Sequence, residues 1–244
     1  LAGALRGQTR FLYFHVMGEP LLHPDLPELL DIAGRMGFRV VLTTNGTLLP
    51  KRQRELLAAQ ALHKVSVSLH SFEANSGVDM EHYLAGCTDF GLAASEAGIL
   101  IDYRLWNLDG AETRGRNEQN DAILNHLHAA YPGNWTQNTW GRRLCDRTFI
   151  HYGEKFDWPS PDAPDHGEAG TCRALRDQLA VLCDGTVVPC CLDGEGRIPL
   201  GNLLAQPLDE ILAAEPARSI AAGFALQKRL HPLCRRCGYA QRFR

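Results

Sequence analysis

The sequence predicts an α/β protein made of a partial (βα) barrel of the TIM type followed by a small cysteine-rich domain. Up to about residue 105, short apolar runs alternate with helical patterns, which indicates parallel strands joined by right-handed crossovers. A complete barrel of this kind needs about 250 residues, so the pattern accounts for only part of one. The cysteines are the second observation, because six of the eight lie in the last third of the chain.

Each element is expected from a local pattern. An apolar run at 11–16 predicts a strand, and an apolar stripe then indicates a helix that Asp25 and Glu28 cap and that Gly37 ends. Further strands are expected at 38–42, 64–69 and 98–104, helices at 51–62 and 117–130, and extended pieces at 145–152. Prolines between 159 and 164 indicate a linker. The predicted division is a barrel (1–105), its end with a linker (106–165) and a cysteine-rich domain (166–244).

Composition and charge narrow the class of protein. Of the 244 residues, 45% are hydrophobic and 22% are charged, and the net charge of −3 argues against a broad nucleic-acid surface. The basic stretch from Lys228 to Arg244 is interpreted as a solvated tail. No apolar run reaches the ~18 residues that span a bilayer, and no signal-peptide pattern is present. We therefore expect a cytoplasmic protein without a nucleic-acid or membrane partner.

Eight cysteines in a cytoplasmic protein indicate metal ligands or reactive thiols, because that compartment keeps thiols reduced. Cys87 and Cys145 stand alone in the sequence and are expected to be small buried residues. His15, His70 and His151 are isolated on expected strands and are interpreted as packed, hydrogen-bonded side chains. The crowded C-terminal cysteines are therefore the candidate metal site.

Two motifs follow the first two expected strands, at the edge of the sheet where α/β folds place their chemistry. The first runs from Met17 to Pro24 (MGEPLLHP) and the second from Thr43 to Leu49 (TTNGTLL). Together they resemble strand ends of the radical S-adenosylmethionine (SAM) enzymes. An ammonium group needs acceptors, and a glycine lets the backbone approach a ligand closely, so the residue types suit a site for the amino group of SAM.

The resemblance implies a SAM-binding site drawn from four strand ends. Its residues would be Met17, Gly18 and Glu19 at the amino group, Asn45 in the second motif, Ser68 toward the ribose and Arg104 toward the carboxylate. At two of these positions the residue type also suits a purely structural role. Ser68 is typical of the polar face of a half-buried strand, and Arg104 of an ordinary surface arginine.

One departure from the family bears on activity. The resemblance implies a catalytic 4Fe-4S cluster on three closely spaced cysteines after the first barrel strand, yet no cysteine precedes Cys87. The first strand and the cluster loop are therefore expected to be missing, no catalytic residue is assigned, and the chain as given is expected to be inactive. It is either a fragment of an active enzyme or a degenerate homologue, and the retained SAM-side motifs favour the fragment.

The last third of the chain resembles a second domain, SPASM, which follows many radical SAM barrels. An Asp184-Gly185 turn is expected to form a hairpin whose second strand, 186–188, leads to Cys190. The resemblance assigns one auxiliary 4Fe-4S cluster to four ligands, which are Cys172, Cys190, Cys234 and Cys237. Four cysteines also suit zinc, but the barrel motifs favour iron. Cys191 is expected to face away from its neighbour Cys190.

The resemblance implies a reaction and a set of partners. The parent protein would cleave SAM reductively to a 5′-deoxyadenosyl radical that takes hydrogen from a substrate, and a peptide or protein is the expected substrate. A flavodoxin or ferredoxin would supply the electron. The alternative is a non-enzymatic iron-sulfur or zinc module for electron transfer or partner recognition.

Overall fold

The computed structural model describes residues 1–74, 77, 79–108 and 118–243. The chain divides into two compact units, which we call the barrel unit (Gly7–Lys155) and the cysteine-rich unit (Leu1–Arg6 with Phe156–Arg244). This division falls inside the segment 106–165 that the sequence assigned to the barrel end and linker. None of the described helices is long and apolar enough to cross a membrane.

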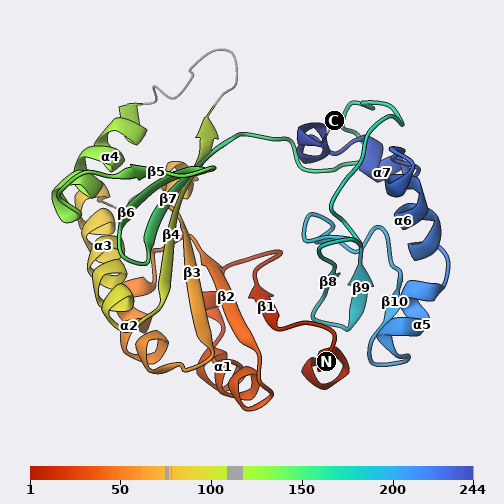
Figure 1. The fold of residues 1–244 in the computed structure, drawn as a ribbon, viewed down its shortest axis with the longest axis horizontal. Helices are drawn as coiled ribbons and strands as arrows, with labels where there is room; N and C mark the ends of the chain where they lie inside the picture. The colour runs from red at the N-terminus through yellow and green to blue at the C-terminus, as the bar shows by residue number, and fades with distance from the viewer. Residues whose placement is uncertain (75–76, 78, 109–117, 244) are drawn as a thin grey trace. The chain divides into compact units, whose positions relative to one another are not determined.

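The barrel unit is built on one sheet with the strand order β1-β2-β3-β4-β7-β6-β5. Its strands are β1 (Phe11–Phe14), β2 (Arg39–Thr44), β3 (Leu62–Ser68), β4 (Leu100–Leu108), β5 (Thr136–Gln137), β6 (Gly141–Cys145) and β7 (Thr148–Glu154). The first five in that order run parallel. Beyond them, β6 pairs antiparallel with β7, and β5 pairs antiparallel with β6. The crossovers contain α1 (Leu26–Arg35), α2 (Leu49–Ala58), α3 (Met80–Glu96), α4 (Glu118–Ala130) and the 3₁₀ turns η2 (Pro20–Leu22) and η3 (Leu69–Ala74). Figure 1 shows the helices on one side of the sheet, which is the predicted partial barrel.

The two faces of this sheet differ in chemistry because successive residues of a strand point to opposite sides. The face toward the helices is apolar, and its fully buried members include Val65, Val67, Ile101, Tyr103, Leu105 and Ile150. Tyr103 shows how closely the helices pack there. Its hydroxyl lies 3.1 Å from the Cys87 carbonyl oxygen of α3 and 2.8 Å from the Tyr131 hydroxyl, within hydrogen-bonding distance of both. The opposite face is polar and carries the candidate site.

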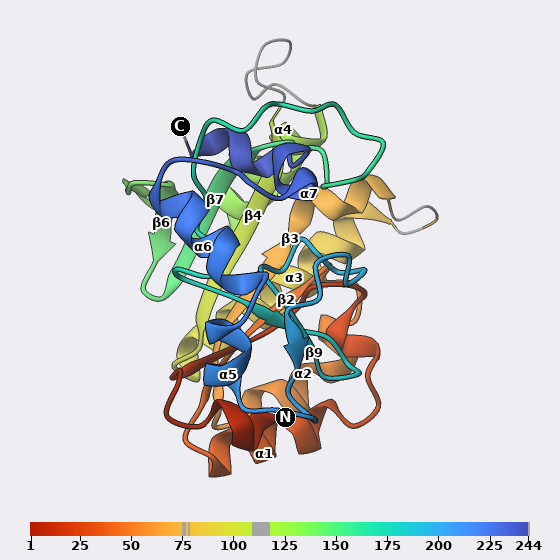
Figure 2. The same ribbon diagram turned by 90° about the vertical axis from the view of Figure 1, so that its right-hand side faces the viewer.

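The cysteine-rich unit is small. It contains a three-stranded antiparallel sheet in the order β10-β9-β8. Its elements are η1 (Ala2–Leu5), β8 (Ala180–Val181), β9 (Thr186–Val188), β10 (Gly201–Asn202), α5 (Leu208–Ala213), α6 (Ala217–Ala225), α7 (Pro232–Arg235) and η4 (Tyr239–Arg242), and Figure 2 shows several of them facing the viewer. The predicted hairpin is present, because β8 pairs with β9 and the Thr186 amide donates to the Asp184 carboxylate at 2.9 Å. Its hydrophobic core brings Val187, Ile211 and Phe224 together.

Several local predictions were wrong. Asp25 precedes α1 but makes no side-chain cap, whereas Asp79, which was not singled out, caps α3 by accepting from the His82 amide at 2.8 Å. The 17-residue helix α3 was not predicted. Cys87 is buried as expected, but Cys145 is exposed.

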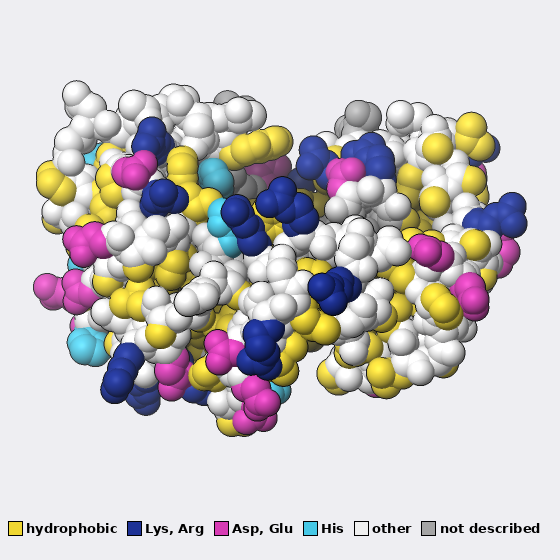
Figure 3. Space-filling view, turned by 60° about the horizontal axis from the view of Figure 1, so that its bottom comes forward, with side chains coloured by type: hydrophobic (Ala, Val, Ile, Leu, Met, Phe, Trp, Pro, Cys, Tyr) yellow, Lys and Arg dark blue, Asp and Glu magenta, His cyan; other side chains and the backbone are white. Residues whose placement is uncertain are grey.

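The C-terminal basic stretch is not a solvated tail throughout, since Arg229 is only 2% exposed. Elsewhere the surface is mixed in sign, and on the face drawn in Figure 3 basic, acidic and hydrophobic side chains are interspersed.

Gly46 provides a test of how α3 packs against the end of β2. Its φ is +85°, and a Cβ there would lie 2.7 Å from the Cys87 Sγ and 3.0 Å from Val67. Gly46→Ala is expected to lower the free energy of unfolding by about 2–4 kcal/mol, through left-handed strain and overpacking together. Gly98→Ala is the matched control, because Gly98 has φ +87° and open space around its Cβ position. Urea unfolding should show the smaller loss for Gly98→Ala, and equal losses would contradict the packing.

Candidate functional site

The loop after β1 has an unusual backbone. Val16 has a φ of +98° and Gly18 of +79°. Glycine adopts such values readily, but a β-branched residue does so only when the surrounding structure holds it there. Backbone strain of this kind clusters at ligand sites, so the loop from Val16 to Glu19 is a candidate site on geometric grounds as well as by motif. Met17, between the two, is 64% exposed.

Glu19 joins two strand ends. One carboxylate oxygen accepts from the Leu21 amide at 3.0 Å, and the other accepts from the Asn45 amide at 2.7 Å. The sequence assigned this carboxylate to the SAM amino group, and the structure adds that both oxygens already hold backbone N–H groups. An ionised carboxylate has about four acceptor positions, so capacity for a ligand ammonium remains.

Asn45 fixes the turn after β2. Its side-chain oxygen accepts from the Thr47 amide at 2.9 Å and from the Thr47 hydroxyl at 2.7 Å, which is a local turn typical of asparagine. Its backbone carbonyl accepts from the Tyr83 hydroxyl of α3 at 2.7 Å. Glu19 and Asn45, predicted from separate motifs, are thus in direct contact.

Arg104 on β4 lies in the polar face of the sheet and is not an ordinary surface arginine. Its side chain is 18% exposed, its Nη2 donates to the Ser66 hydroxyl at 3.0 Å, and its guanidinium lies over the Trp106 ring at 4.8 Å. Ser68 ends β3, where its carbonyl accepts from the Ser71 hydroxyl at 2.6 Å. The charge of Arg104 also reaches His15, because burial first and Arg104 second lower the pKa of that imidazole.

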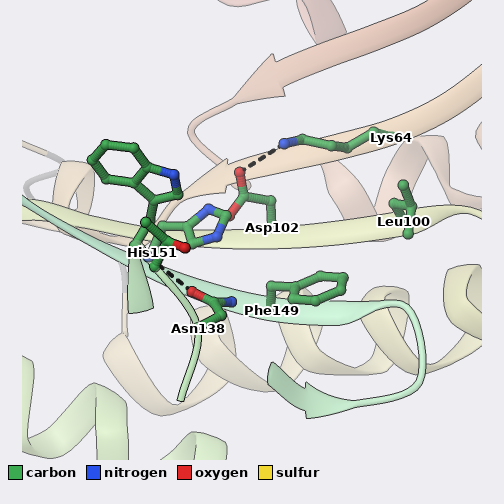
Figure 4. Close-up of a pocket in the computed structure, with 8 residues that line it drawn as sticks. Lys64, Leu100, Asp102, Asn138, Phe149 and His151 are labelled. Carbon is green, nitrogen blue, oxygen red and sulfur yellow. Dashed lines mark hydrogen bonds and ion pairs between the residues drawn. The ribbon is translucent and has the colours of Figure 1, made fainter. Parts of the chain in front are cut away.

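A buried carboxylate network occupies the same polar face and was not predicted. Asp102 is 3% exposed, with the Lys64 ammonium 3.0 Å from one oxygen and the His151 Nδ1 2.7 Å from the other. Figure 4 shows Lys64 and His151 approaching Asp102 from the strands on either side of β4. Burial acts to raise the pKa of Asp102, but His151, Lys64 and Arg104 outweigh it and lower the pKa to about 2.

These groups line a hollow of about 260 Å³, whose walls are Lys64, Leu100, Asp102, Asn138, Thr139, Trp140, Phe149 and His151. Arg104 lies outside this wall but 3.5 Å from Asp102, so with Lys64 it gives this part of the polar face an excess of positive charge. The hollow is suited to hold an anionic or hydroxyl-bearing group rather than a cation.

In the cysteine-rich unit, four thiols gather at the edge of the hydrophobic core. Cys172, Cys190 and Cys234 pack against that core, and Cys237 is 8% exposed. Burial first, and then the nearby Cys191, Cys172 and Cys237, raise the pKa of Cys190 to about 12. Burial likewise raises the pKa of Cys234, with Cys190, Cys172 and Cys237 as the next contributors. The predicted ligands therefore influence one another as neighbours.

The local structure explains this gathering. Cys190 follows β9 directly after Pro189, Cys234 lies in α7, and Cys237 lies just beyond the end of that helix. Cys190 and Cys191 occupy a bend rather than the extended strand from which their opposite orientation was predicted. Cys183 is exposed.

The donor set fits an iron-sulfur cluster. A thiol buried against apolar side chains resists ionisation, yet metal ligands are thiolates, so a cationic centre would supply the missing stabilisation. No three described His, Cys, Asp or Glu side chains close around one point as ligands of a single ion would. A 4Fe-4S cluster takes four thiolates, each bound to its own iron.

Comparison with known families matches residues 172–238 to SPASM, an iron-sulfur cluster-binding domain. All four clustered thiols lie in that range. Two curated relatives match parts of the chain. The chain is 31% identical over 98 residues to a tungsten-containing aldehyde ferredoxin oxidoreductase cofactor-modifying protein of Pyrococcus furiosus, covering 40% of this chain and 26% of the relative. It is 44% identical over 91 residues to Fe-coproporphyrin III synthase of Methanosarcina barkeri, covering 36% of this chain and 22% of the relative. The matches thus span about a quarter of these relatives.

Two solved structures share the fold. BtrN in complex with AdoMet and 2-DOIA aligns with a TM-score of 0.56 at 15% identity, covering 97% of this chain and 76% of that one. SuiB of Streptococcus suis bound to S-adenosylmethionine aligns with a TM-score of 0.56 at 12% identity, covering 97% and 64%. At these identities the likeness is one of fold. Residues 172–238 thus form a SPASM domain, and the relatives and the shared fold support the resemblance to radical SAM enzymes that the strand-end motifs indicate.

The structure brings the predicted residues together in two groups. Glu19 contacts Asn45 across the first two strand ends, and the four cysteines form the second group. Arg104 joins neither group but belongs to the network around Asp102. The signal for this network was a row of polar residues at alternate positions on adjacent strands, Lys64 and Ser66 on one and Asp102 and Arg104 on the next.

The depressed pKa of Asp102 predicts how stability depends on pH. A carboxyl whose pKa falls from 3.8 unfolded to about 2 folded contributes stability above pH about 4 and loses it as the pH falls toward about 2. Asp102→Asn should therefore destabilise the protein at pH 7, and the part of that deficit due to ionisation, about 2 kcal/mol, should vanish over this window. Urea unfolding at a series of pH values measures it. Asp31→Asn, on the exposed side of α1, is the control, and a deficit that does not change with pH would contradict the network.

Proposed function

We propose that these residues are part of a radical SAM enzyme that binds SAM at the carboxyl ends of β1 to β4 and holds one auxiliary 4Fe-4S cluster in its SPASM domain. The cluster ligands would be Cys172, Cys190, Cys234 and Cys237. The observation that carries the proposal is the gathering of these four thiols within the segment that matches SPASM. The polar face of the sheet supplies the SAM site and the substrate side of the reaction.

A catalytic 4Fe-4S cluster, distinct from the auxiliary one, would supply the electron that cleaves SAM to a 5′-deoxyadenosyl radical, and that radical would take hydrogen from the substrate. The chain's own residues bind and orient. Glu19 holds the loops after β1 and β2 in register and presents acceptor oxygen to the SAM amino group. Arg104 is fixed by Ser66 and Trp106, so its charge is available to a carboxylate without a large loss of side-chain freedom.

The hollow beside Asp102 is the proposed place for the substrate. Lys64 in its wall and Arg104 beside Asp102 outnumber that carboxylate, and Trp140 and Phe149 add apolar surface. A peptide or protein substrate is proposed in line with the resemblance, and the fold relative SuiB has been solved bound to the precursor peptide SuiA. A flavodoxin or ferredoxin is the proposed reductant.

No cysteine precedes Cys87, so the 244 residues offer no trio for a catalytic cluster beside the SAM site. We therefore propose that this chain alone binds iron and sulfide without cleaving SAM. If it acts by itself, the second candidate is electron transfer through the auxiliary cluster.

The adjacent pair Cys190 and Cys191 gives the test of the cluster. Cys190→Ala is expected to abolish iron binding, because a four-thiolate site loses one ligand, and to destabilise the cysteine-rich unit, whose folding free energy includes the metal. Cys191→Ala is the matched control and should keep its iron. Anaerobic reconstitution of the full chain should give about four irons and four sulfides. Bound zinc without sulfide would refute the cluster, and the opposite result for the two variants would move the ligand to Cys191.

Affinity for SAM tests the strand-end site. Without a catalytic cluster, binding depends on protein hydrogen bonds worth about 0.5–1.5 kcal/mol each, so it should be weak. Glu19→Ala removes the acceptor and lets both loops move, so the dissociation constant should rise about tenfold. Glu28→Ala, on the exposed side of α1, should leave it unchanged. Calorimetry measures both variants, and affinity that survives Glu19→Ala would place the pocket elsewhere.

A further inference from the structure

A buried arginine in the cysteine-rich unit lacks a counter-charge. Arg229 follows α6 and is 2% exposed. Its Nη2 donates to the Ala169 carbonyl, but its Nε and Nη1 have no hydrogen-bond partner. Among the described residues, no carboxylate forms an ion pair with it. The side chain of its neighbour Lys228, by contrast, is 58% exposed and lies 3.5 Å from Glu168.

The backbone around Arg229 is shaped to enclose its guanidinium. The Arg229 amide donates to the Glu168 carbonyl at 2.6 Å, and the Gly170 amide donates to the Gln227 carbonyl at 2.8 Å, so the two segments pair antiparallel. A Cβ on Gly170 would lie 2.1 Å from Nη2 and 2.8 Å from Cζ of Arg229. Only glycine leaves room here. The enclosing segment leads directly to Cys172, one of the four gathered thiols.

An enclosed cation without a partner is expensive. Removing a charged group from water costs several kcal/mol unless an opposite charge or full hydrogen bonding compensates. Such a group in a folded protein therefore indicates a partner outside the chain's own atoms. The gathered thiols are the candidate partner, because Cys172 lies two residues beyond Gly170, the residue that packs on the Arg229 guanidinium. Burial raises the pKa of Cys237, and the charge of Arg229 is among the influences that lower it.

We propose that Arg229 is the counter-cation of the auxiliary cluster, donating its unpartnered N–H groups to sulfur atoms of the cluster and its thiolates. The inference rests on the proposed cluster at Cys172, Cys190, Cys234 and Cys237. A four-iron cluster with four thiolate ligands is anionic, and hydrogen bonds and charge around its sulfur atoms set its reduction potential. A cation enclosed beside it favours the more negative, reduced state. Arg229 is thus a positioning and tuning residue, not a ligand.

The test measures potential on the reconstituted full chain. Arg229→Gln keeps a donor for the Ala169 carbonyl but removes the charge. At a fixed potential, the ratio of reduced to oxidised cluster should therefore fall about tenfold, which for one electron equals a decrease of about 59 mV in the midpoint potential. Arg229→Lys keeps the charge and should lie between that variant and wild type. Lys228→Gln removes a neighbouring but solvated charge and should leave the potential unchanged. Iron and sulfide content and the midpoint potential are measured for all four proteins.

The outcomes are separable. If the wild-type chain takes up no iron and sulfide, the proposed function is wrong. If the Arg229→Gln variant holds a cluster with the wild-type potential, only this inference is overturned. That second result is the one expected if a buried water satisfies the guanidinium. If Arg229→Gln cannot hold the cluster, retention of the cluster by Arg229→Lys supports the charge role. Loss in both variants overturns it, because a charge role is rescued by lysine and a purely structural one is not.

Discussion

The proposed cluster places one constraint on the cysteine-rich unit, which is that four thiols would have to become anions while remaining packed against an apolar core. Burial alone works against this, as the pKa of Cys190 at about 12 shows. The unit has little else to rely on, since its strands are two or three residues long and its longest helix has nine. Binding through these thiols as thiolates therefore requires a source of positive charge beside them. A metal cluster and a buried arginine are the two sources that this chemistry permits.

The barrel unit has a different task, which is to hold charged side chains together on one face of its sheet. Alternation along the strands solves this by giving the helices an apolar face and leaving Ser66, Asp102 and Arg104 on the other. Parallel register then places residues from neighbouring strands side by side, Ser66 beside Asp102 and Arg104 beside His151. The sheet that buries the core thus also assembles the polar face.

Much of this organisation was predictable from sequence because its signals are local. The first four strands are marked by apolar runs. The loops after β1 and β2 are marked by Gly18 and Asn45. Helix α3 was missed because Gly86 and Gly91 interrupt its pattern with residues of low helix propensity, and only the fold shows that Gly91 makes room for the Tyr103 hydroxyl. Asp102 and Arg229 were missed for another reason. Burial of a charge depends on strand register and chain pairing, which are not visible in a stretch of sequence.

The two hydrogen bonds of Glu19 have a dynamic consequence. Because one carboxylate holds the Leu21 and Asn45 amides, the loop after β1 cannot swing away without releasing the loop after β2. Local opening of either loop is then an event of both, and their amides should exchange with solvent as one cooperative unit. A ligand that orders the first loop would order the second at a reduced entropic cost. In this way a single side chain makes two neighbouring crossovers respond together.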